Sequence, residues 1–379
     1  MFPSETEVAI VGGGPAGTAA ALTLGRYTDR RCLVLEAGGY AEPRIGETVS
    51  PALMPLLDYL GAAIPDEALL PCYGSEAAWG SGEPLPRASI FSGEGAGWSL
   101  DRRRFDLSLA EAAEAGGAVV ARHSVLREVE PDPSGGWALS VEHRRRTHRI
   151  LARQVIDASG RRAAFARRAG AVRSAGDRLV AAAAFLTCPA GANHPQTLLV
   201  EAEADGWWYT AGLPGGGAVA AYLTDADLIR RSGEGLEAFF ARRLAATAHV
   251  AARVAGATGR TAPHIHLARS QRLDRCAGPG WVAAGDAASS FDPLSSLGIG
   301  HALASGIQAA RIVHARLDGD ETLALAYPGD VVRIHQEHDR RLALIYAAER
   351  RWPDRPFWRR RNGIGLGGHG NGDAPAAFG

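Results

Sequence analysis

The N-terminal segment Glu7-Val-Ala-Ile-Val-Gly-Gly-Gly-Pro-Ala-Gly17 constrains the fold most strongly. An apolar run leads into a glycine-rich turn, an Ala- and Leu-rich stretch follows, and a second apolar run ends at Glu36. This order predicts a dinucleotide-binding βαβ unit. In such a unit Gly12 permits the tight turn, Gly14 lets the backbone approach a pyrophosphate, and Gly17 lets the helix pack closely on the strand.

The start of the predicted helix and the end of the second strand supply the polar groups of this unit. Pro15 and Ala16 open the helix, whose N-terminus offers free N–H groups and a positive dipole end to phosphates. Glu36 lies nineteen residues beyond Gly17, where a carboxylate can accept hydrogen bonds from a ribose diol. The unit is therefore expected to bind the unphosphorylated adenosine half of FAD or NAD.

Composition excludes several other classes of protein. The 379 residues carry a net charge of zero, so the overall charge draws the chain neither to nucleic acid nor to an anionic membrane. No run of eighteen apolar residues occurs and the first strand begins by Glu7, so we expect a cytoplasmic protein without a cleaved signal. The four cysteines are widely spaced and contain no CxxC pair, which favours buried thiols over disulfides or a metal site.

All 41 basic side chains are arginine, because the sequence contains no lysine. Chemistry that needs a lysine amine is therefore excluded. A coding bias toward Ala, Gly and Arg is the simplest cause.

The order of apolar runs predicts an α/β fold in which a nucleotide-binding sheet is interrupted by a second, antiparallel sheet with helical cover. Residues 65–97 are expected to be irregular, and Asp101 is expected to cap a helix. Expected strands lie at 118–120, 125–130, 137–143, 147–151, 154–160, 179–186, 197–201, 207–209, 218–224 and 280–286. Expected helical stretches lie at 52–60, 101–115, 236–252, 300–317 and 330–350, and a flexible tail begins at residue 363.

Three motifs, Gly12–Gly17, Asp157-Ala-Ser-Gly160 and Gly285-Asp286, follow one another in an order that resembles the FAD-dependent monooxygenase superfamily of aromatic hydroxylases and flavin-dependent halogenases. The resemblance covers nearly the whole chain. It implies a Rossmann-like FAD-binding domain of the glutathione-reductase type, a substrate domain and C-terminal helices. The implied division is 1–75, 98–171 and 270–325 for FAD, 76–97 and 172–269 for substrate, 326–362 for a C-terminal helical segment, and 363–379 for the tail.

The resemblance also implies roles for single residues. Glu36 would hold the adenosine ribose and Asp286 a ribityl hydroxyl. The loop 293–300 would hold the isoalloxazine, since its N–H groups precede a helix and can face the flavin ring. Arg102 would approach the cofactor. The remaining cofactor-binding candidates are Gly12, Gly14, Pro15, Ala16, Gly17, Arg44, Pro293, Gly298 and Ile299.

Within the superfamily, Arg44-Ile-Gly-Glu-Thr48 and Asp292-Pro-Leu-Ser-Ser296 resemble the halogenase branch. Tryptophan halogenases, however, use an active-site lysine to hold hypohalous acid, and this chain has none. They also carry a glutamate after the Pro-Leu of the flavin loop, where this chain has Ser295, and their Trp-x-Trp-x-Ile-Pro motif is only loosely similar to 207–214. The departures from the family pattern argue against halogenation.

A closer resemblance is to flavoproteins that mature tryptophan-derived quinone cofactors. The similar segments are Trp79-Gly-Ser81, Gly97-Trp-Ser-Leu-Asp-Arg102, Asp205-Gly-Trp-Trp-Tyr209 with Thr224-Asp225, and Arg351-Trp-Pro near Phe357-Trp-Arg-Arg. This resemblance implies an FAD-dependent monooxygenase that hydroxylates an indole, free or within a peptide or protein, through a flavin C4a-hydroperoxide. O2 is then a co-substrate. Electrons would come from NAD(P)H or from a separate flavin reductase.

Candidates for the reacting site each have a plainer alternative. Ser295, Ser296, His301 and Glu47 are the catalytic candidates, although His301 is more simply a polar residue at a helix start and Glu47 could only fix its loop. Trp79, Trp207 and Tyr209 are the substrate-binding candidates. Strand alternation sends Trp207 and Tyr209 to one face of their strand and Trp208 to the other.

Other functions stay open at this stage. The runs Arg144–Arg146 and Arg359–Arg361 could dock an acidic partner but are more simply solvated faces. A halogenase-like enzyme without the lysine, or a geranylgeranyl-reductase-like enzyme that reduces a lipid double bond, would share the fold. A Rab-escort-like carrier would lack flavin, and the intact loop 293–300 argues against it.

Overall fold

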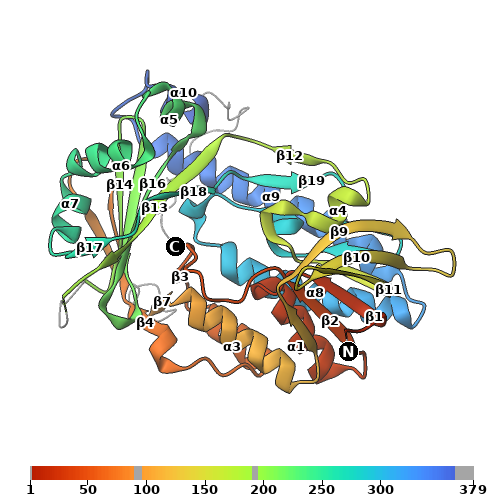
Figure 1. The fold of residues 1–379 in the computed structure, drawn as a ribbon. Coiled ribbons are helices and arrows are strands. Elements are labelled where there is room, and N and C mark those ends of the chain that lie inside the picture. Colours follow the sequence, from red (N-terminus) through yellow and green to blue (C-terminus); the bar gives the residue numbers. More distant parts are fainter. Residues whose placement is uncertain (1, 89–95, 190–194, 363–379) are drawn as a thin grey trace.

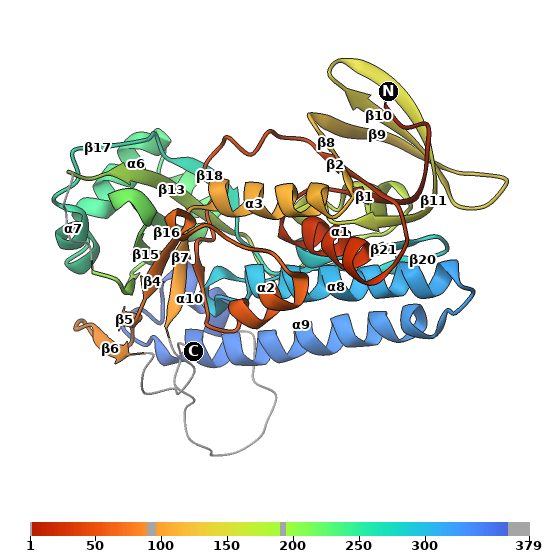
Figure 2. The same cartoon turned by 90° about the horizontal axis from the view of Figure 1, so that it is seen from below.

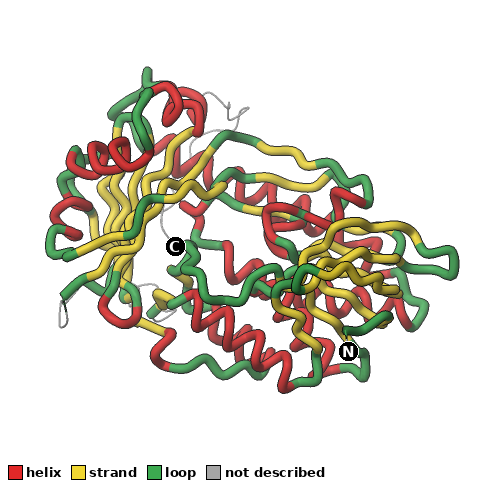
Figure 3. The backbone as a smooth tube through the Cα atoms, viewed as in Figure 1, coloured by secondary structure: helices red, strands yellow, loops and turns green. Residues whose placement is uncertain are grey.

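The computed structural model describes residues 2–88, 96–189 and 195–362. Two large sheets lie at opposite ends of the molecule and are connected by long helices and loops (Figures 1 and 3). This arrangement agrees with the expected α/β fold with a second sheet. The expected tail at 363–379 lies outside the described residues.

The first sheet contains the predicted nucleotide-binding strands. Its order is β20-β21-β11-β1-β2-β8, with β10 paired to β11 and β9 paired to β10. The pairs β1–β2, β1–β11, β2–β8 and β11–β21 are parallel, as expected for a sheet built from βαβ units. The strands are β1 (Glu5–Val11), β2 (Cys32–Glu36), β8 (Val119–Arg122), β9 (Ser124–Pro131), β10 (Trp137–His143), β11 (Arg146–Asp157), β20 (Ala277–Gly278) and β21 (Trp281–Ala283).

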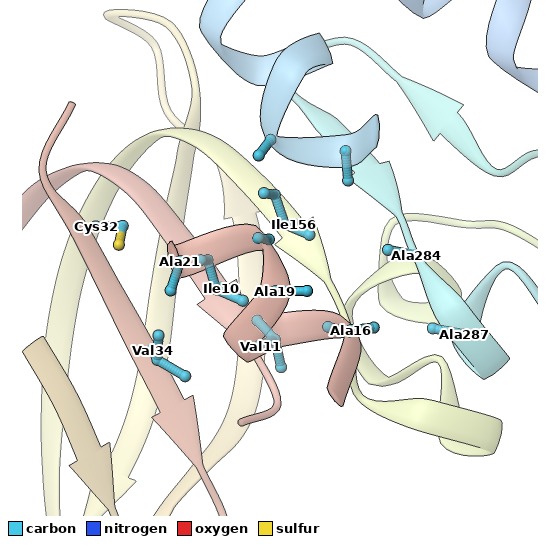
Figure 4. Packing of buried hydrophobic residues seen from close by; sticks show 14 of the residues in the cluster. Ile10, Val11, Ala16, Ala19, Ala21, Cys32, Val34, Ile156, Ala284 and Ala287 are labelled. Atoms are coloured by element: carbon cyan, nitrogen blue, oxygen red, sulfur yellow. The ribbon is translucent and has the colours of Figure 1, made fainter. Parts of the chain in front are cut away.

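Helix α1 (Pro15–Tyr27) covers this sheet and packs against α3 (Arg102–Ala115) and α8 (Gly298–Leu317). Figure 4 shows Ala16 and Ala19 of α1 beside Val11 and Ile156 of the sheet. A β-carbon on Gly306 of α8 would lie 2.2 Å from the carbonyl oxygen of Ala16, so a side chain there would separate the two helices. A small residue thus brings the middle of α8 close to the start of α1.

The second sheet has the order β17-β13-β16-β15-β14-β5-β6, with β18 also paired to β13. Helices α5 (Ala226–Arg231), α6 (Leu236–Ala245) and α7 (His249–Val254) belong to this end of the molecule, and α6 and α7 pack on its outer face (Figure 1). The strands are β5 (Gly74–Ala78), β6 (Leu85–Ala88), β13 (Leu179–Thr187), β14 (Leu198–Glu203), β15 (Gly206–Gly212), β16 (Ala218–Asp225), β17 (Gly259–Arg260) and β18 (His264–Leu267).

The remaining elements connect the two sheets. Helix α9 (Thr322–Ala348) runs beside α8, and α10 (Pro356–Asn362) packs against α9 (Figure 2). Two three-stranded sheets, β12-β19-β22 and β3-β7-β4, lie between the large ones. Their strands are β3 (Thr48–Val49), β4 (Leu69–Cys72), β7 (Gly97–Leu100), β12 (Arg173–Ala175), β19 (Gln271–Leu273) and β22 (Ser289–Ser290); the remaining helices are α2 (Leu53–Leu60) and α4 (Ala164–Arg168).

Several expected boundaries were wrong. Within 65–97 the described residues are not irregular throughout, because 69–72, 74–78 and 85–88 are strands. β5 pairs in parallel with β14, more than one hundred residues further along the chain. The expected strands at 147–151 and 154–160 form one strand, β11, that pairs with β10 at one end and with β1 and β21 further along.

Helix boundaries also differ from the expectation. The expected helix 236–252 is two helices, α6 and α7, and α9 begins at Thr322 rather than 330. Pro328 lies inside α9, where buried Tyr327 donates a hydrogen bond to the carbonyl oxygen of Ala283 at 2.9 Å. Tertiary packing therefore holds a segment that proline alone disfavours. None of the described helices is both long and apolar enough to cross a lipid bilayer.

Candidate functional site

A cavity of about 1930 Å³ lies between the two large sheets. Its walls come from the glycine turn after β1, the loop before β3, the loop between β22 and α8, strands β15 and β18, and the C-terminal half of α9. Of the predicted site residues, those that line it are Gly12, Gly14, Pro15, Ala16, Glu36, Arg44, Glu47, Arg102, Trp207, Tyr209, Asp286, Pro293, Ser295, Ser296, Gly298 and Ile299.

The glycine turn has the geometry that its sequence predicts. Gly12 has φ of +105°, and a β-carbon there would lie 2.3 Å from the carbonyl oxygen of Ala158. A β-carbon on Gly17 would lie 1.9 Å from the carbonyl oxygen of Gly12, which explains the close packing of α1 on β1. At Gly14 the nearest atom to such a carbon is 4.0 Å away, on Arg44, so this position faces open cavity. The N-terminus of α1 can therefore receive an anion.

Glu36 lies at the end of β2 and is buried. Its Oε2 accepts a hydrogen bond from the backbone N–H of Gly13 at 2.7 Å, and its Oε1 accepts one from the N–H of Gly38 at 2.8 Å. Arg44 also donates to Oε1, at 3.5 Å, so of the roughly four acceptor positions of a carboxylate about one remains for a ribose hydroxyl. The two backbone bonds hold the carboxylate beside the glycine turn.

A buried ion-pair network that was not predicted from the sequence lies next to this turn. Asp106 is 1% exposed. Its carboxylate accepts two hydrogen bonds of 3.0 Å from Arg102 and one of 3.1 Å from Arg44. Arg102 also donates to the carbonyl oxygens of Ile45 and Gly46. The spacing of Arg102 and Asp106, one turn apart on α3, was the available signal. The network fixes the loop 43–51 against the cavity.

Asp286 lies in the turn that follows β21 and lines the cavity. Its Oδ2 is 3.2 Å from Nε of Arg161. Burial raises the pKa of Asp286, while Arg161 and Arg102 oppose that rise. Arg161, which the sequence did not single out, also donates to the carbonyl oxygens of Arg269 and Phe291 and so joins the turn to the loop before α8.

Asp292 holds the loop before α8 in place through hydrogen bonds. This fully buried residue accepts the N–H of Leu294 at 2.9 Å and the hydroxyl of Tyr346 at 2.7 Å. Burial raises the pKa of Asp292 to about 6. Ser295 donates to the carbonyl oxygen of Asp292, and Ser296 adopts a left-handed conformation with φ of +52°. The loop thereby turns sharply before α8 begins at Gly298.

Glu47 and Tyr209 meet inside the cavity. Glu47 is 1% exposed, and its Oε2 has no hydrogen-bond partner among the described residues. Burial raises the pKa of Glu47 to about 7, while Arg102 and the hydroxyl of Tyr209 oppose that rise. Burial and the neighbouring Glu47 also raise the pKa of Tyr209 well above its usual value. The pair is therefore a buried acid that exchanges its proton near neutral pH beside a phenol that stays protonated.

The strand alternation predicted for β15 is confirmed. Trp207 and Tyr209 line the cavity, and Trp208 packs on the opposite face against Tyr222 and Phe240. Trp79 does not line the described cavity. It lies behind Trp207, with ring centroids 6.4 Å apart, and donates its indole N–H to the carbonyl oxygen of Ile345.

His301 also lies outside the described cavity lining. Its ring packs edge-on against Phe291 at 4.7 Å, and its Nε2 is buried without a partner among the described residues. Burial and His335 lower the pKa of His301 to about 4. The ring is therefore neutral at physiological pH, and the structure gives it packing contacts rather than a place at the reacting site.

Three polar positions of the lining have groups that suit FAD. The open backbone at Gly14 and the start of α1 suit a pyrophosphate, Glu36 suits a ribose diol, and Asp286 suits a ribityl hydroxyl. Glu47 belongs to the same cavity wall, and its Oε2 has no hydrogen-bond partner among the described residues.

Known proteins of similar sequence and structure fit this description. The family described as "Tryptophan halogenase" matches residues 82–366. The putative FAD-dependent oxidoreductase LodB of Marinomonas mediterranea is 34% identical over 359 residues, which are 93% of this chain and 96% of LodB.

Two solved structures extend the comparison. The flavin-dependent halogenase CmlS has a TM-score of 0.83 and 24% identity, over 95% of this chain and 68% of that one, and shows the shared fold. The peptidyl tryptophan dihydroxylase QhpG, described as essential for tryptophylquinone cofactor biogenesis, has a TM-score of 0.73 and 27% identity, over 94% of this chain and 79% of that one. The chain thus belongs to the tryptophan halogenase family and is an FAD-dependent oxidoreductase of the monooxygenase type.

Proposed function

We propose that the protein is an FAD-dependent monooxygenase that hydroxylates an aromatic substrate, namely the indole of a tryptophan held in a peptide or protein. The single observation that carries this proposal is the continuous cavity. It joins the polar residues suited to FAD, from Gly14 to Asp286, with the Trp207 and Tyr209 wall of β15, and Glu47 belongs to the same lining.

Hydroxylation rather than halogenation is favoured by what the chain lacks. The sequence has no lysine that could hold hypohalous acid, although the family takes its name from halogenases. Ser295 occupies the position after Pro-Leu, and its hydroxyl is engaged with the carbonyl oxygen of Asp292. QhpG, a dihydroxylase of peptidyl tryptophan, supports an indole within a polypeptide as the substrate class.

FAD, when bound, supplies oxygen activation for electrophilic transfer to an electron-rich ring, with O2 as co-substrate and NAD(P)H or a separate flavin reductase as electron source. The residues of the chain position the groups and exclude water. Tyr209 and the almost fully buried Trp207 form an aromatic part of the cavity wall. The N–H groups of 294–296 are bonded within the loop, so the backbone N–H groups left for a ligand are those at the start of α8.

Glu47 is the residue best placed to hold or accept a proton in this cavity. Its pKa of about 7 allows both protonation states at working pH, and the Tyr209 hydroxyl beside it favours the ionised carboxylate. Hydroxylation of an indole carbon releases the proton of that carbon, and a carboxylate in the cavity wall can accept a proton. We assign His301 no part in this step, because it lies outside the cavity lining.

A direct test uses the flavin-loaded protein and a tryptophan-containing peptide. The protein is reduced without oxygen, mixed with buffer that carries ¹⁸O2, and followed in a stopped-flow spectrometer for a transient absorbance before oxidised flavin returns. Mass spectrometry then measures the peptide. We expect ¹⁸O in the indole and no halogen when chloride and bromide are present.

Two outcomes would overturn the proposal. Incorporation of halogen would make the enzyme a halogenase that works without the lysine. Direct reoxidation with no transient and no oxygen in any aromatic peptide would instead favour a reductase, and lipid double bonds would be the next substrates to examine.

A further inference from the structure

Oxidisable aromatic side chains form an unbroken series from the cavity wall to the surface of the C-terminal segment. The series starts at Trp207, which lines the cavity, and ends at Trp352, which is partly exposed beyond α9. The ring-centroid distances are 6.4 Å for Trp79–Trp207, 5.9 Å for Trp79–Tyr346, 5.3 Å for Trp79–Trp358, 6.1 Å for Tyr346–Trp358 and 6.2 Å for Trp352–Trp358.

The inner part of the series is also joined by hydrogen bonds. The indole N–H of Trp207 donates to the hydroxyl of Tyr346 at 3.1 Å, and that hydroxyl donates to Oδ2 of Asp292 at 2.7 Å. All three side chains are buried. A tyrosine loses its phenolic proton when it loses an electron, because the phenol radical cation is a strong acid. Asp292 is a carboxylate placed to receive that proton.

We propose that Trp207, Tyr346, Trp358 and Trp352, with Trp79 beside them, form an electron-transfer chain that carries oxidising equivalents from the cavity to the protein surface. This function is distinct from substrate hydroxylation. It protects a site that handles reduced flavin and O2 when no substrate is present to be oxidised.

Electrons and protons balance at each step. A one-electron oxidant of the peroxide or radical class, formed in the cavity during uncoupled turnover, removes one electron from Trp207. Tyr346 replaces that electron and passes its proton to Asp292. Trp358 then reduces the tyrosyl radical, which regains the proton from Asp292, and Trp352 reduces Trp358. A thiol or ascorbate-class reductant in solution finally reduces Trp352, so no residue is consumed.

The surroundings of the last residue suit a transient positive charge. The Arg351 guanidinium lies 4.3 Å from the centre of the Trp352 ring, but it is paired with buried Glu349 at 2.6 Å. The pair reduces the repulsion that an unpaired cation would impose on an oxidised indole. Trp352 stacks on Trp358 with an interplanar angle of 24°, so the final transfer crosses one ring contact.

Core packing alone would also gather these rings, and Trp208 provides the control that separates the two roles. It is buried next to Trp207 in the same strand but faces Tyr222, Phe239 and Phe240 on the outer side of the sheet. Trp208→Phe therefore removes a buried indole from β15 without touching the series. Trp207→Phe and Trp358→Phe each interrupt it. Tyr346→Phe removes one of two routes, because Trp79 also lies between Trp207 and Trp358.

The test uses the full-length, flavin-loaded protein, with folding and flavin content checked by circular dichroism and absorbance. Blue light excites the oxidised flavin in the presence of a diffusible electron acceptor and without substrate, and peptide mass mapping then locates oxidised tryptophan. A laser flash on the same samples records tryptophan and tyrosine radicals. In the wild-type protein and in Trp208→Phe we expect oxidation products to accumulate at Trp352.

Interruption of the series should lower Trp352 oxidation several-fold and lengthen the lifetime of radicals near the cavity. Asp292→Asn should suppress the tyrosyl radical while tryptophan radicals persist. Equal oxidation of Trp352 in Trp207→Phe, Trp358→Phe and Trp208→Phe would overturn the proposal. These readouts need no hydroxylated product, so they test the electron-transfer chain independently of the proposed hydroxylation.

Discussion

Arg102 and Asp106, one turn apart on α3, form a two-point ion pair with both contacts at 3.0 Å, and Asp106 is almost completely buried. Arg44 reaches the same carboxylate from the loop before β3, so one side chain joins a helix to the wall of the cofactor cavity. The loop 43–51, which contains Glu47, depends on this carboxylate for its position.

Asp106→Asn is therefore expected to destabilise the fold and weaken flavin binding together. Removing the charge leaves two arginines facing a neutral amide, at a cost on the order of 3 kcal/mol in unfolding free energy. Urea unfolding and a flavin fluorescence titration measure the two effects. Glu114→Gln, at the half-exposed Arg122 pair, is the control and should cost at most about 1 kcal/mol. Equal losses in the two variants would contradict the structural role of Asp106.

Two substitutions in the glycine turn distinguish an effect on folding from an effect on ligand binding. Gly12→Ala places a β-carbon 2.3 Å from a carbonyl oxygen at φ of +105°, so we expect a loss of stability on the order of 3 kcal/mol. Gly14 has φ of −75° and open space around it, so Gly14→Ala should change stability by less than about 1 kcal/mol. Its flavin affinity should nevertheless fall at least about tenfold, because the methyl group enters the space for the pyrophosphate.

Thermal unfolding and flavin titration of both variants decide this prediction. If Gly14→Ala binds flavin as tightly as the wild-type protein, the pyrophosphate does not lie against this turn.

Glu47 should contribute a pH-dependent term to stability. Burial raises its pKa from 4.5 to about 7 in the folded protein, so the folded state holds the proton more tightly than the unfolded state. The stability from this group is complete below about pH 4.5 and declines as the pH rises toward about 7, by on the order of 3 kcal/mol. Glu47→Gln cannot ionise and should lack this decline.

The measurement is the difference between wild-type and Glu47→Gln unfolding free energies across this pH range. The difference cancels the contributions of Glu203 and Asp292, whose pKa values burial also raises. A difference that does not vary with pH would show that Glu47 titrates normally.

Tyr209→Phe should raise the pKa of Glu47 further. The phenol hydroxyl favours the ionised carboxylate, and its loss leaves burial less opposed. The midpoint of the Glu47-dependent decline should therefore move to higher pH in Tyr209→Phe. Trp208 lies on the opposite face of the same strand, so this midpoint should not change in Trp208→Phe. A midpoint that moves to lower pH in Tyr209→Phe would contradict the proposed interaction.

Much of the nucleotide-binding half followed from local pattern. Gly12, Gly14, Gly17 and Glu36 lie where the motif predicts, because a βαβ unit is built from residues close in sequence and its turn tolerates few alternatives. The two faces of β15 were likewise predicted, since strand alternation is a property of the backbone itself.

Pairings between distant segments were not predictable in the same way. The irregular composition of 65–97 concealed β5, whose place is set by β14 rather than by its own sequence. Trp79 was a substrate-binding candidate and His301 a catalytic candidate. Packing against Trp207 and Phe291 places both outside the described cavity lining.

By itself, then, the sequence determined the dinucleotide-binding unit, the family resemblance and the absence of lysine, all of which depend on residue identity and short spacings. The tertiary structure alone decided that Glu47 lies beside Tyr209 and that Asp292 accepts a hydrogen bond from Tyr346. These contacts join residues 162 and 54 positions apart. Their pKa values and hydrogen bonds arise from burial by elements that no local pattern brings together.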